Sequence, residues 1–142
     1  MANIYLQIPL KTQLITQQKE LDLCSLSESV AGMIHLIATT HFGENKHDIT
    51  FGNELWDYDF ENIDNVQAFK EKLAGSLRET IIGHEKRLSD VRVNINFEQV
   101  ITKALNRRVK QKIEINVEGI LIKTNEEFKH TEMFYMGPLS YY

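Results

Sequence analysis

The clearest hydrophobic pattern in this chain predicts a long helix that begins near residue 65. Apolar residues recur there at spacings of three, four, four and four, which places them on one helical face. They are Val66, Phe69, Leu73, Leu77 and Ile81. Asp64 or Asn65 can cap the start of this helix, and Gly75 is the one weak helix former inside it.

The pattern changes to strict alternation after a charged tripeptide at residues 85–87. Alternation of apolar and polar residues is typical of a strand with one buried face. Two such segments cover Val91–Phe97 and Val109–Val117 and predict an antiparallel hairpin joined by a polar connection. A third extended segment, Phe128–Met136, is expected to continue the same sheet.

A second helix is predicted upstream of these elements. Ser25 or Ser27 can cap this helix, and Glu28, three residues after Ser25, gives the spacing of a capping box. An apolar stripe with spacings of three and four follows, formed by Val30, Met33, Ile34 and Ile37. The helix is expected to end near Phe42-Gly43, since glycine accepts the left-handed conformation found after helix ends.

The first residues alternate as well, which predicts an N-terminal strand over Ile4–Leu10. Pro9 would confine this strand to a sheet edge, because proline cannot donate a ladder hydrogen bond. The polar segment Lys11–Asp22 is expected to form an arm or loop. The predicted fold is α+β, with two helices packed on one face of a small antiparallel sheet. Residues 1–24 form a strand and arm in this prediction, and residues 25–142 form the single domain.

Composition agrees with one globular domain and limits its partners. The chain has 142 residues, of which 42% are hydrophobic and 25% are charged, and its net charge is −4. A mildly acidic chain argues against binding to nucleic acid, which selects basic surfaces. No segment has the pattern of a signal peptide or of a membrane span, so we expect a protein of the cytoplasm without direct membrane insertion.

The chain shows few signs of catalytic or metal chemistry. Cys24 is the one cysteine, so no intramolecular disulfide can form and a zinc site built on several thiolates is excluded. The glycines form no phosphate-binding loop, and the five histidines never occur at i, i+4 with a glutamate between them. We therefore expect no cofactor and no metal.

One acidic cluster supports an alternative enzymatic hypothesis. It lies among aromatic residues in the segment LWDYDFEN and consists of Glu54, Asp57, Asp59 and Glu61. Glycoside hydrolases use two carboxylates, one as acid and one ionised, so this cluster could supply the catalytic pair of a peptidoglycan hydrolase. A solvated strand edge whose aromatic side chains point inward explains the same residues more simply.

The order of motifs from residue 28 to residue 97 resembles the phage tail baseplate wedge and type VI secretion baseplate family, whose secretion member is called TssE. That family has an apolar helix ending in Thr-x-x-Gly-Glu, then Phe-Gly, an acidic-aromatic stretch, and a second helix that closes on Glu-Pro-Arg before a Val-x-Val strand. The corresponding residues here are Thr40–Glu44, Phe51-Gly52, LWDYDFEN, Glu85-Lys86-Arg87-Leu88 and Val91-Arg92-Val93. Lys86 stands where the family pattern has proline.

The resemblance implies a non-enzymatic structural protein of a contractile injection machine. Some members of the family were once labelled lysozyme-like. Its expected partners are other baseplate wedge proteins and subunits of the contractile sheath, in a cytoplasmic assembly docked at the inner membrane. The expected partner-binding residues are Glu85, Lys86, Arg87, Leu88 and Arg92. A carboxylate and a planar guanidinium can form charge-assisted hydrogen bonds with a partner, and a free sheet edge can accept a partner strand.

Overall fold

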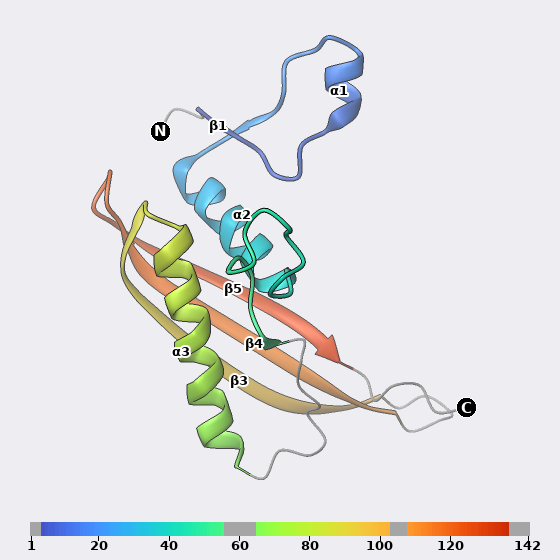
Figure 1. Cartoon of the computed structure of the whole chain (residues 1–142), viewed down its shortest axis with the longest axis vertical. Coiled ribbons are helices and arrows are strands. Elements are labelled where there is room, and N and C mark those ends of the chain that lie inside the picture. Colours follow the sequence, from blue (N-terminus) through green and yellow to red (C-terminus); the bar gives the residue numbers. More distant parts are fainter. Residues whose placement is uncertain (1–3, 56–64, 103–107, 137–142) are drawn as a thin grey trace.

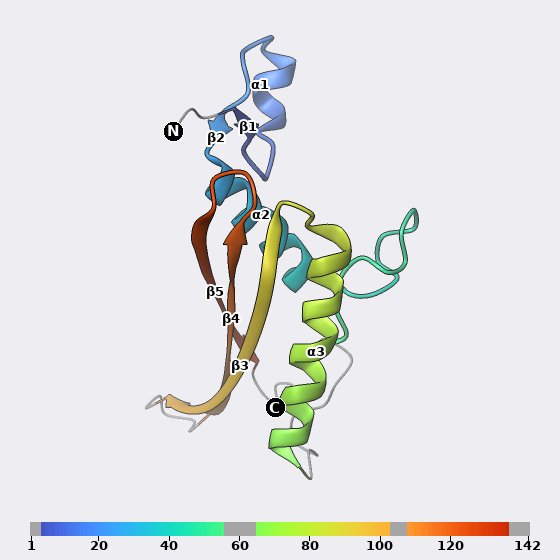
Figure 2. The same cartoon turned by 90° about the vertical axis from the view of Figure 1, so that its left-hand side faces the viewer.

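The computed structural model describes residues 4–55, 65–102 and 108–136. In chain order the elements are β1 (Tyr5–Leu6), α1 (Thr12–Thr16), β2 (Leu23–Cys24), α2 (Leu26–Thr39), α3 (Val66–His84), β3 (Leu88–Thr102), β4 (Arg108–Leu121) and β5 (Glu126–Met136). The predicted α+β class is confirmed. Figure 1 shows α3 running along the sheet, and Figure 2 shows α2 and α3 on the same face of it.

The main sheet has the strand order β3-β4-β5, and both pairings are antiparallel. The predicted hairpin and the predicted third strand are therefore confirmed. β3 and β4 are longer than the alternating segments Val91–Phe97 and Val109–Val117 that predicted them. Their ladder runs from the pair Leu88↔Leu121 to the pair Thr102↔Arg108. The register is continuous between β4 and β5 but shifts in β3 between Ser89 and Arg92.

The core lies between the sheet and the two helices. The side chains with the least exposure come from α2, α3 and all three long strands, and Ile115 and Val117 of the central strand are almost completely buried. The main members of this cluster are Val30, Ile34, Ile37, Leu73, Leu77, Ile81, Ile95, Ile113, Ile115, Val117, Leu121 and Phe128. Most of the predicted helical stripes lie in or against this core, while Val66 at the start of α3 is exposed.

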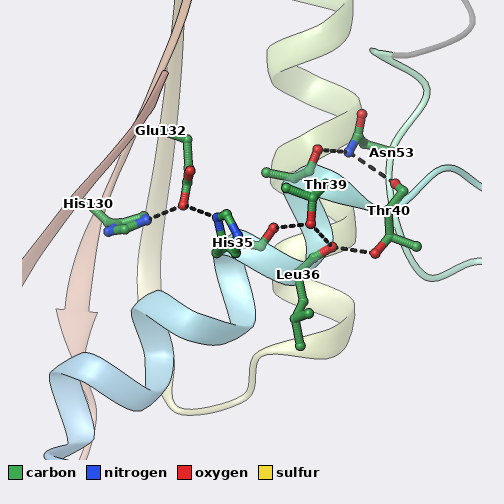
Figure 3. Close-up of polar contacts among 8 residues, drawn as sticks. His35, Leu36, Thr39, Thr40, Asn53, His130 and Glu132 are labelled. Atoms are coloured by element: carbon green, nitrogen blue, oxygen red, sulfur yellow. Dashed lines mark hydrogen bonds and ion pairs between the residues drawn. The ribbon is translucent and has the colours of Figure 1, made fainter. Parts of the chain in front are cut away.

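Both ends of α2 are fixed by side chains. The predicted capping box is present, since the Ser25 hydroxyl accepts from the Glu28 amide and the Glu28 carboxylate accepts from the Ser25 amide. The helix ends at Thr39, earlier than predicted. The reason is Asn53, whose buried side-chain amide donates to the carbonyls of Ile37, Ala38 and Thr40. Figure 3 shows Asn53 beside Thr40 at the end of the helix. Gly43 has φ 84° but lies in the loop after the helix.

The N-terminal arm, residues 4–24, differs from its prediction. The expected strand over Ile4–Leu10 is reduced to the two residues of β1, which pair with the two residues of β2. The segment expected to be an arm or loop contains the short helix α1. The described residues from 25 onward form the body of the molecule. In Figure 1 the arm projects from this body near the start of α2. A strand without a long neighbour cannot satisfy more of its backbone groups, which explains its short length.

Candidate docking junction

The α3–β3 junction, residues 85–88, is organised by an ion pair between Glu85 and Arg87. Glu85 follows the last residue of α3 and is 2% exposed. Its Oε1 accepts from Nε of Arg87 at 2.8 Å and its Oε2 accepts from Nη2 at 2.8 Å, a bidentate arrangement. The backbone amide of Arg87 donates to the same Oε1 at 3.1 Å. The pair therefore closes the turn from within the molecule, at the place where the family pattern has proline.

Arg87 also connects the junction to two distant segments. Its Nη1 donates to the hydroxyl of Ser29 in α2 at 2.7 Å, and its guanidinium lies over the ring of Tyr5 in β1 at 5.5 Å. The hydrogen bonds with Glu85 raise the pKa of the Arg87 guanidinium above its already high ordinary value, although partial burial acts in the opposite direction. Arg87 is thus a permanent cation that joins the arm, α2 and the junction.

The other expected docking residues lie apart from this pair. Lys86 is exposed, and its Nζ donates to the carbonyl of Ile82 at 3.2 Å. Leu88 is buried in the core. Arg92 is an exposed residue of β3, and its Nη2 lies 3.8 Å from an Oε2 of Glu118 in β4. Among the expected docking residues, solvent can therefore reach Lys86, Arg92 and the outer part of the Arg87 guanidinium.

A loop beside the junction carries contacts that the sequence pattern did not reveal. His84, the last residue of α3, contacts Oδ2 of Asp48 through Nε2 at 3.0 Å and the carbonyl of Thr80 through Nδ1 at 3.0 Å. The hydroxyl of Thr50 donates to Oδ1 of Asp48 at 2.6 Å. These hydrogen bonds, led by the one from Thr50 and followed by the one from His84, lower the pKa of the Asp48 carboxyl below its usual range. The loop is thereby attached to the end of α3.

The two outer strands of the sheet present different edges. On β3, the register shift follows Ser89, and Nε of Arg78 in α3 donates to the carbonyl of Val91 at 2.8 Å. On β5, the ladder with β4 is regular from Glu126 to Met136. Bulges and side-chain contacts disturb the backbone pattern that an added strand needs, so β5 has the more regular edge.

A buried carboxylate fastens α2 to β5. Oε1 of Glu132 lies 2.9 Å from Nδ1 of His35 in α2 and 2.7 Å from Nε2 of His130, its neighbour along β5 (Figure 3). Glu132 is buried and His35 is exposed. Sequence spacing could not reveal this contact, because 97 residues separate His35 from Glu132.

The alternative carboxylate cluster falls largely outside the described residues. Asp57, Asp59 and Glu61 all lie there, while Glu54 is half-buried beside a small hollow lined by Leu55, Leu73, Ser76 and Leu77 among others. Across residues 4–55, 65–102 and 108–136, no three His, Cys, Asp or Glu side chains form a group that could hold a metal ion. Over the same residues, no helix combines the length and the apolar character needed to cross a membrane.

Two solved structures have a similar fold. One is a protein of Geobacter sulfurreducens provisionally assigned as a tail lysozyme, with a TM-score of 0.58, 22% identity, and coverage of 85% of this chain and 100% of that chain. The other belongs to the baseplate complex from the type VI secretion system, with a TM-score of 0.53, 18% identity, and coverage of 76% of this chain and 91% of that chain. At these identities the similarity shows a shared fold.

Comparison of the sequence with protein families gives a more specific result. No curated protein matches this chain. The family model described as baseplate wedge protein gp25 matches residues 24–126, which is most of the chain. The resemblance indicated by the sequence motifs is confirmed, and the chain belongs to the baseplate wedge protein gp25 family.

Proposed function

We propose that this protein is a non-enzymatic adaptor in the baseplate of a type VI secretion system, joining the wedge proteins to the contractile sheath. Membership of a structural baseplate family supports this role, as does the fold shared with a component of the type VI baseplate complex. The proposed location is the cytoplasmic assembly that docks at the inner membrane. The observation that carries the proposal is the α3–β3 junction, a rigid turn that presents cationic side chains.

In this proposal the residues of the junction have two roles. Glu85 and Arg87 fix the shape of the turn through their bidentate pair, and Leu88 anchors it in the core. Lys86, Arg92 and the outer part of Arg87 contact acidic or carbonyl groups of a wedge protein. Such a division suits a docking site, because a rigid turn loses little conformational entropy when its partner binds.

The sheath contact is assigned to the β5 edge. This edge has a regular ladder, whereas the β3 edge is interrupted by a register shift and by Arg78. A strand of a sheath subunit could pair with β5 and pack against the exposed side chains of Met133 and Tyr135. Main-chain hydrogen bonds would supply the affinity of this contact, and the two apolar side chains would fix its register.

The wedge contact is tested by reversing charge at the exposed cations. The double variant Lys86→Glu, Arg92→Glu should keep the fold and bind co-expressed wedge proteins at least tenfold more weakly, a loss of about 1.4 kcal/mol. Lys46→Glu, which reverses one charge at an exposed loop position, is the control and should bind normally. Equal binding of the double variant and the control would remove the junction from the proposal.

The sheath contact needs a separate experiment. Met133→Asp should reduce pairing with sheath subunits and leave wedge binding intact, because the substitution places a charge where a partner strand would pack. Ile122→Asp is the control, since Ile122 is exposed to a similar degree but lies in the turn before β5. Pull-down of purified sheath subunits by the two variants measures the difference, and an equal loss in both would argue against the β5 edge.

A further inference from the structure

The N-terminal arm carries a concentration of exposed aliphatic side chains. Of the twelve large hydrophobic residues exposed among the described residues, six lie between residues 4 and 23. They are Ile4, Leu6, Ile8, Leu10, Ile15 and Leu23. Scattered exposed apolar residues are ordinary, but a cluster confined to one short segment marks an interaction surface.

The arm is too small to cover these side chains itself. β1 and β2 have two residues each, and none of the five residues of α1 is buried. A two-stranded pair with one apolar face is marginal in water unless another element packs on it. The outer face of this pair therefore lacks a cover within the described part of the chain.

The strand register separates an inner face of the arm from an outer face. The pair Tyr5↔Cys24 faces the body, where the Tyr5 ring meets Arg87 and Cys24 is buried. The next pair, Leu6↔Leu23, points the opposite way, since successive side chains alternate across a strand. Leu6 and Leu23 are 49% and 50% exposed and lie side by side. The outer face is therefore a defined patch.

The arm is positioned against the body by specific contacts. Arg87 and Lys123 of the body both lie near the Tyr5 ring, at 5.5 Å and 5.9 Å, while the bond from the Gln7 amide to the carbonyl of Asp22, 3.0 Å long, holds the arm together internally. Ile8 lies against Gly32 of α2, where a Cβ on the glycine would be 3.8 Å from the Cβ of Ile8. These contacts fix the direction in which the outer face points.

The charges of the arm indicate what kind of surface it fits. Residues 4–23 carry two lysines and two acids, which cancel, and Lys11 forms an ion pair with Asp22. The net charge of −4 therefore resides in the rest of the chain. A neutral aliphatic patch suits an uncharged aliphatic surface. A second copy of this chain is disfavoured, because arm-to-arm contact would bring two acidic bodies together.

The arm also precedes the part of the chain that the gp25 family model matches, which begins at residue 24. We propose that the outer face of the arm, centred on Leu6 and Leu23, is a docking surface for an uncharged aliphatic patch on a wedge protein. This inference rests on the proposed baseplate function and adds a second contact with the wedge, separate from the cations of the α3–β3 junction. Tyr5 and Arg87 link the two contacts, because they join the arm directly to the junction.

The test compares two double variants in which exposed aliphatic residues are replaced by asparagine. Leu6→Asn, Leu23→Asn alters the arm patch, and Val66→Asn, Met133→Asn is the control at exposed positions away from both the arm and the α3–β3 junction. Each variant of the whole 142-residue chain is co-expressed with type VI baseplate wedge proteins, and the affinity for the purified wedge complex is measured. Thermal unfolding confirms that both variants are folded, which is expected because all four side chains are exposed.

The arm variant is expected to bind the wedge complex at least tenfold more weakly than the control. Equal affinity of the two variants, with normal binding by the unchanged protein, would overturn this inference and leave the proposed function standing. Failure of the unchanged protein to bind would overturn the proposed function and this inference together. Sedimentation that shows a dimer of the isolated protein, dissociated by the arm variant, would identify a second copy as the occupant and overturn the assignment to a wedge protein.

Discussion

At the scale of single residues, Gly52 occupies a position that other residues cannot take without strain. Its φ is 119°, and a Cβ built there would lie 2.5 Å from the carbonyl oxygen of Thr40. Gly52→Ala should therefore lower the free energy of unfolding by about 2 kcal/mol or more, since it adds a steric clash to an unfavourable backbone conformation. Urea unfolding monitored by circular dichroism measures this change.

Gly43→Ala provides the matched control for Gly52. Gly43 also has a positive φ, 84°, but a Cβ added to it would have no atom within 4 Å apart from those of its own chain neighbours. This variant should lose about 1 kcal/mol, the cost of the backbone conformation alone. Equal losses at the two glycines would show that the approach of Thr40 contributes nothing.

The Glu85–Arg87 pair allows a second prediction at this scale. Removing one member of a buried ion pair costs about 3 kcal/mol, because the remaining charge is left without its partner. Arg87→Ala should approach this loss, whereas the same change in a Glu85→Gln background should cost about 1 kcal/mol less, since a neutral amide needs no counter-charge. A double-mutant cycle by urea unfolding gives the coupling, and a coupling of zero would mean that the pair adds no stability.

At the scale of elements, the attachment of the 41–55 loop to α3 should depend on pH through Asp48. The pKa of this carboxyl is lowered in the folded protein, so the folded protein binds fewer protons at this site than the unfolded chain does. Its contribution to stability is fully present above the usual pKa range of a carboxyl and is lost as the pH falls through the lowered value. Asp48→Asn should thus destabilise the protein at about pH 6, and this effect should shrink as the pH falls through the lowered pKa of the Asp48 carboxyl.

The control for this prediction is Asp90→Asn, a change at an exposed acid in β3. Thermal unfolding of the two variants and the unchanged protein at each pH measures the difference. A stability gap between Asp48→Asn and the unchanged protein that stays constant over this range would show that the carboxylate is not the source of the effect.

Elements also show how much of this fold can be predicted from the sequence. The stripe from Phe69 to Ile81 and the alternation in β3 and β4 are local patterns, and both produced the predicted element. The end of α2 was not predictable, because it depends on Asn53, a residue that reaches back from beyond the helix. The prediction of a strand over Ile4–Leu10 was wrong for a similar reason. The alternation is clear, but the sequence does not show that the partner strand, β2, has only two residues.

The candidate site was predictable in part for the same reason. In the sequence, the charged residues of the junction separate an apolar pattern of helical spacing from an apolar pattern of strand alternation. Their internal pairing depends on the burial of Glu85, and the further contacts of Arg87 reach Ser29 and Tyr5, 58 and 82 positions earlier in the chain. The contact between Asp48 and His84 spans 36 positions and had no local signal. Sequence patterns therefore located the turn between α3 and β3, whereas its internal contacts depend on the tertiary structure, and the docking role of its residues stays a prediction.

At the scale of the whole molecule, the body and the arm should differ in cooperativity. The body has one core shared by two helices and three strands, and β4 lies at its centre. The arm has two short strands and depends on contacts such as that between Tyr5 and Arg87. Local openings follow the amount of buried apolar contact, so the arm should open without unfolding of the body.

Native-state hydrogen exchange tests this division. The amides of Ile115 and Val117 in β4 should exchange through global unfolding, and the amide of Gln7, which donates to Asp22, should exchange through local opening of the arm. Tyr5→Ala removes the ring that lies beneath the two cations and should lower protection of Gln7 by about 1 kcal/mol without changing that of β4. If Tyr5→Ala lowers protection equally in β4 and in the arm, the arm belongs to the same cooperative unit as the core. Its outer face would then open only when the whole molecule unfolds.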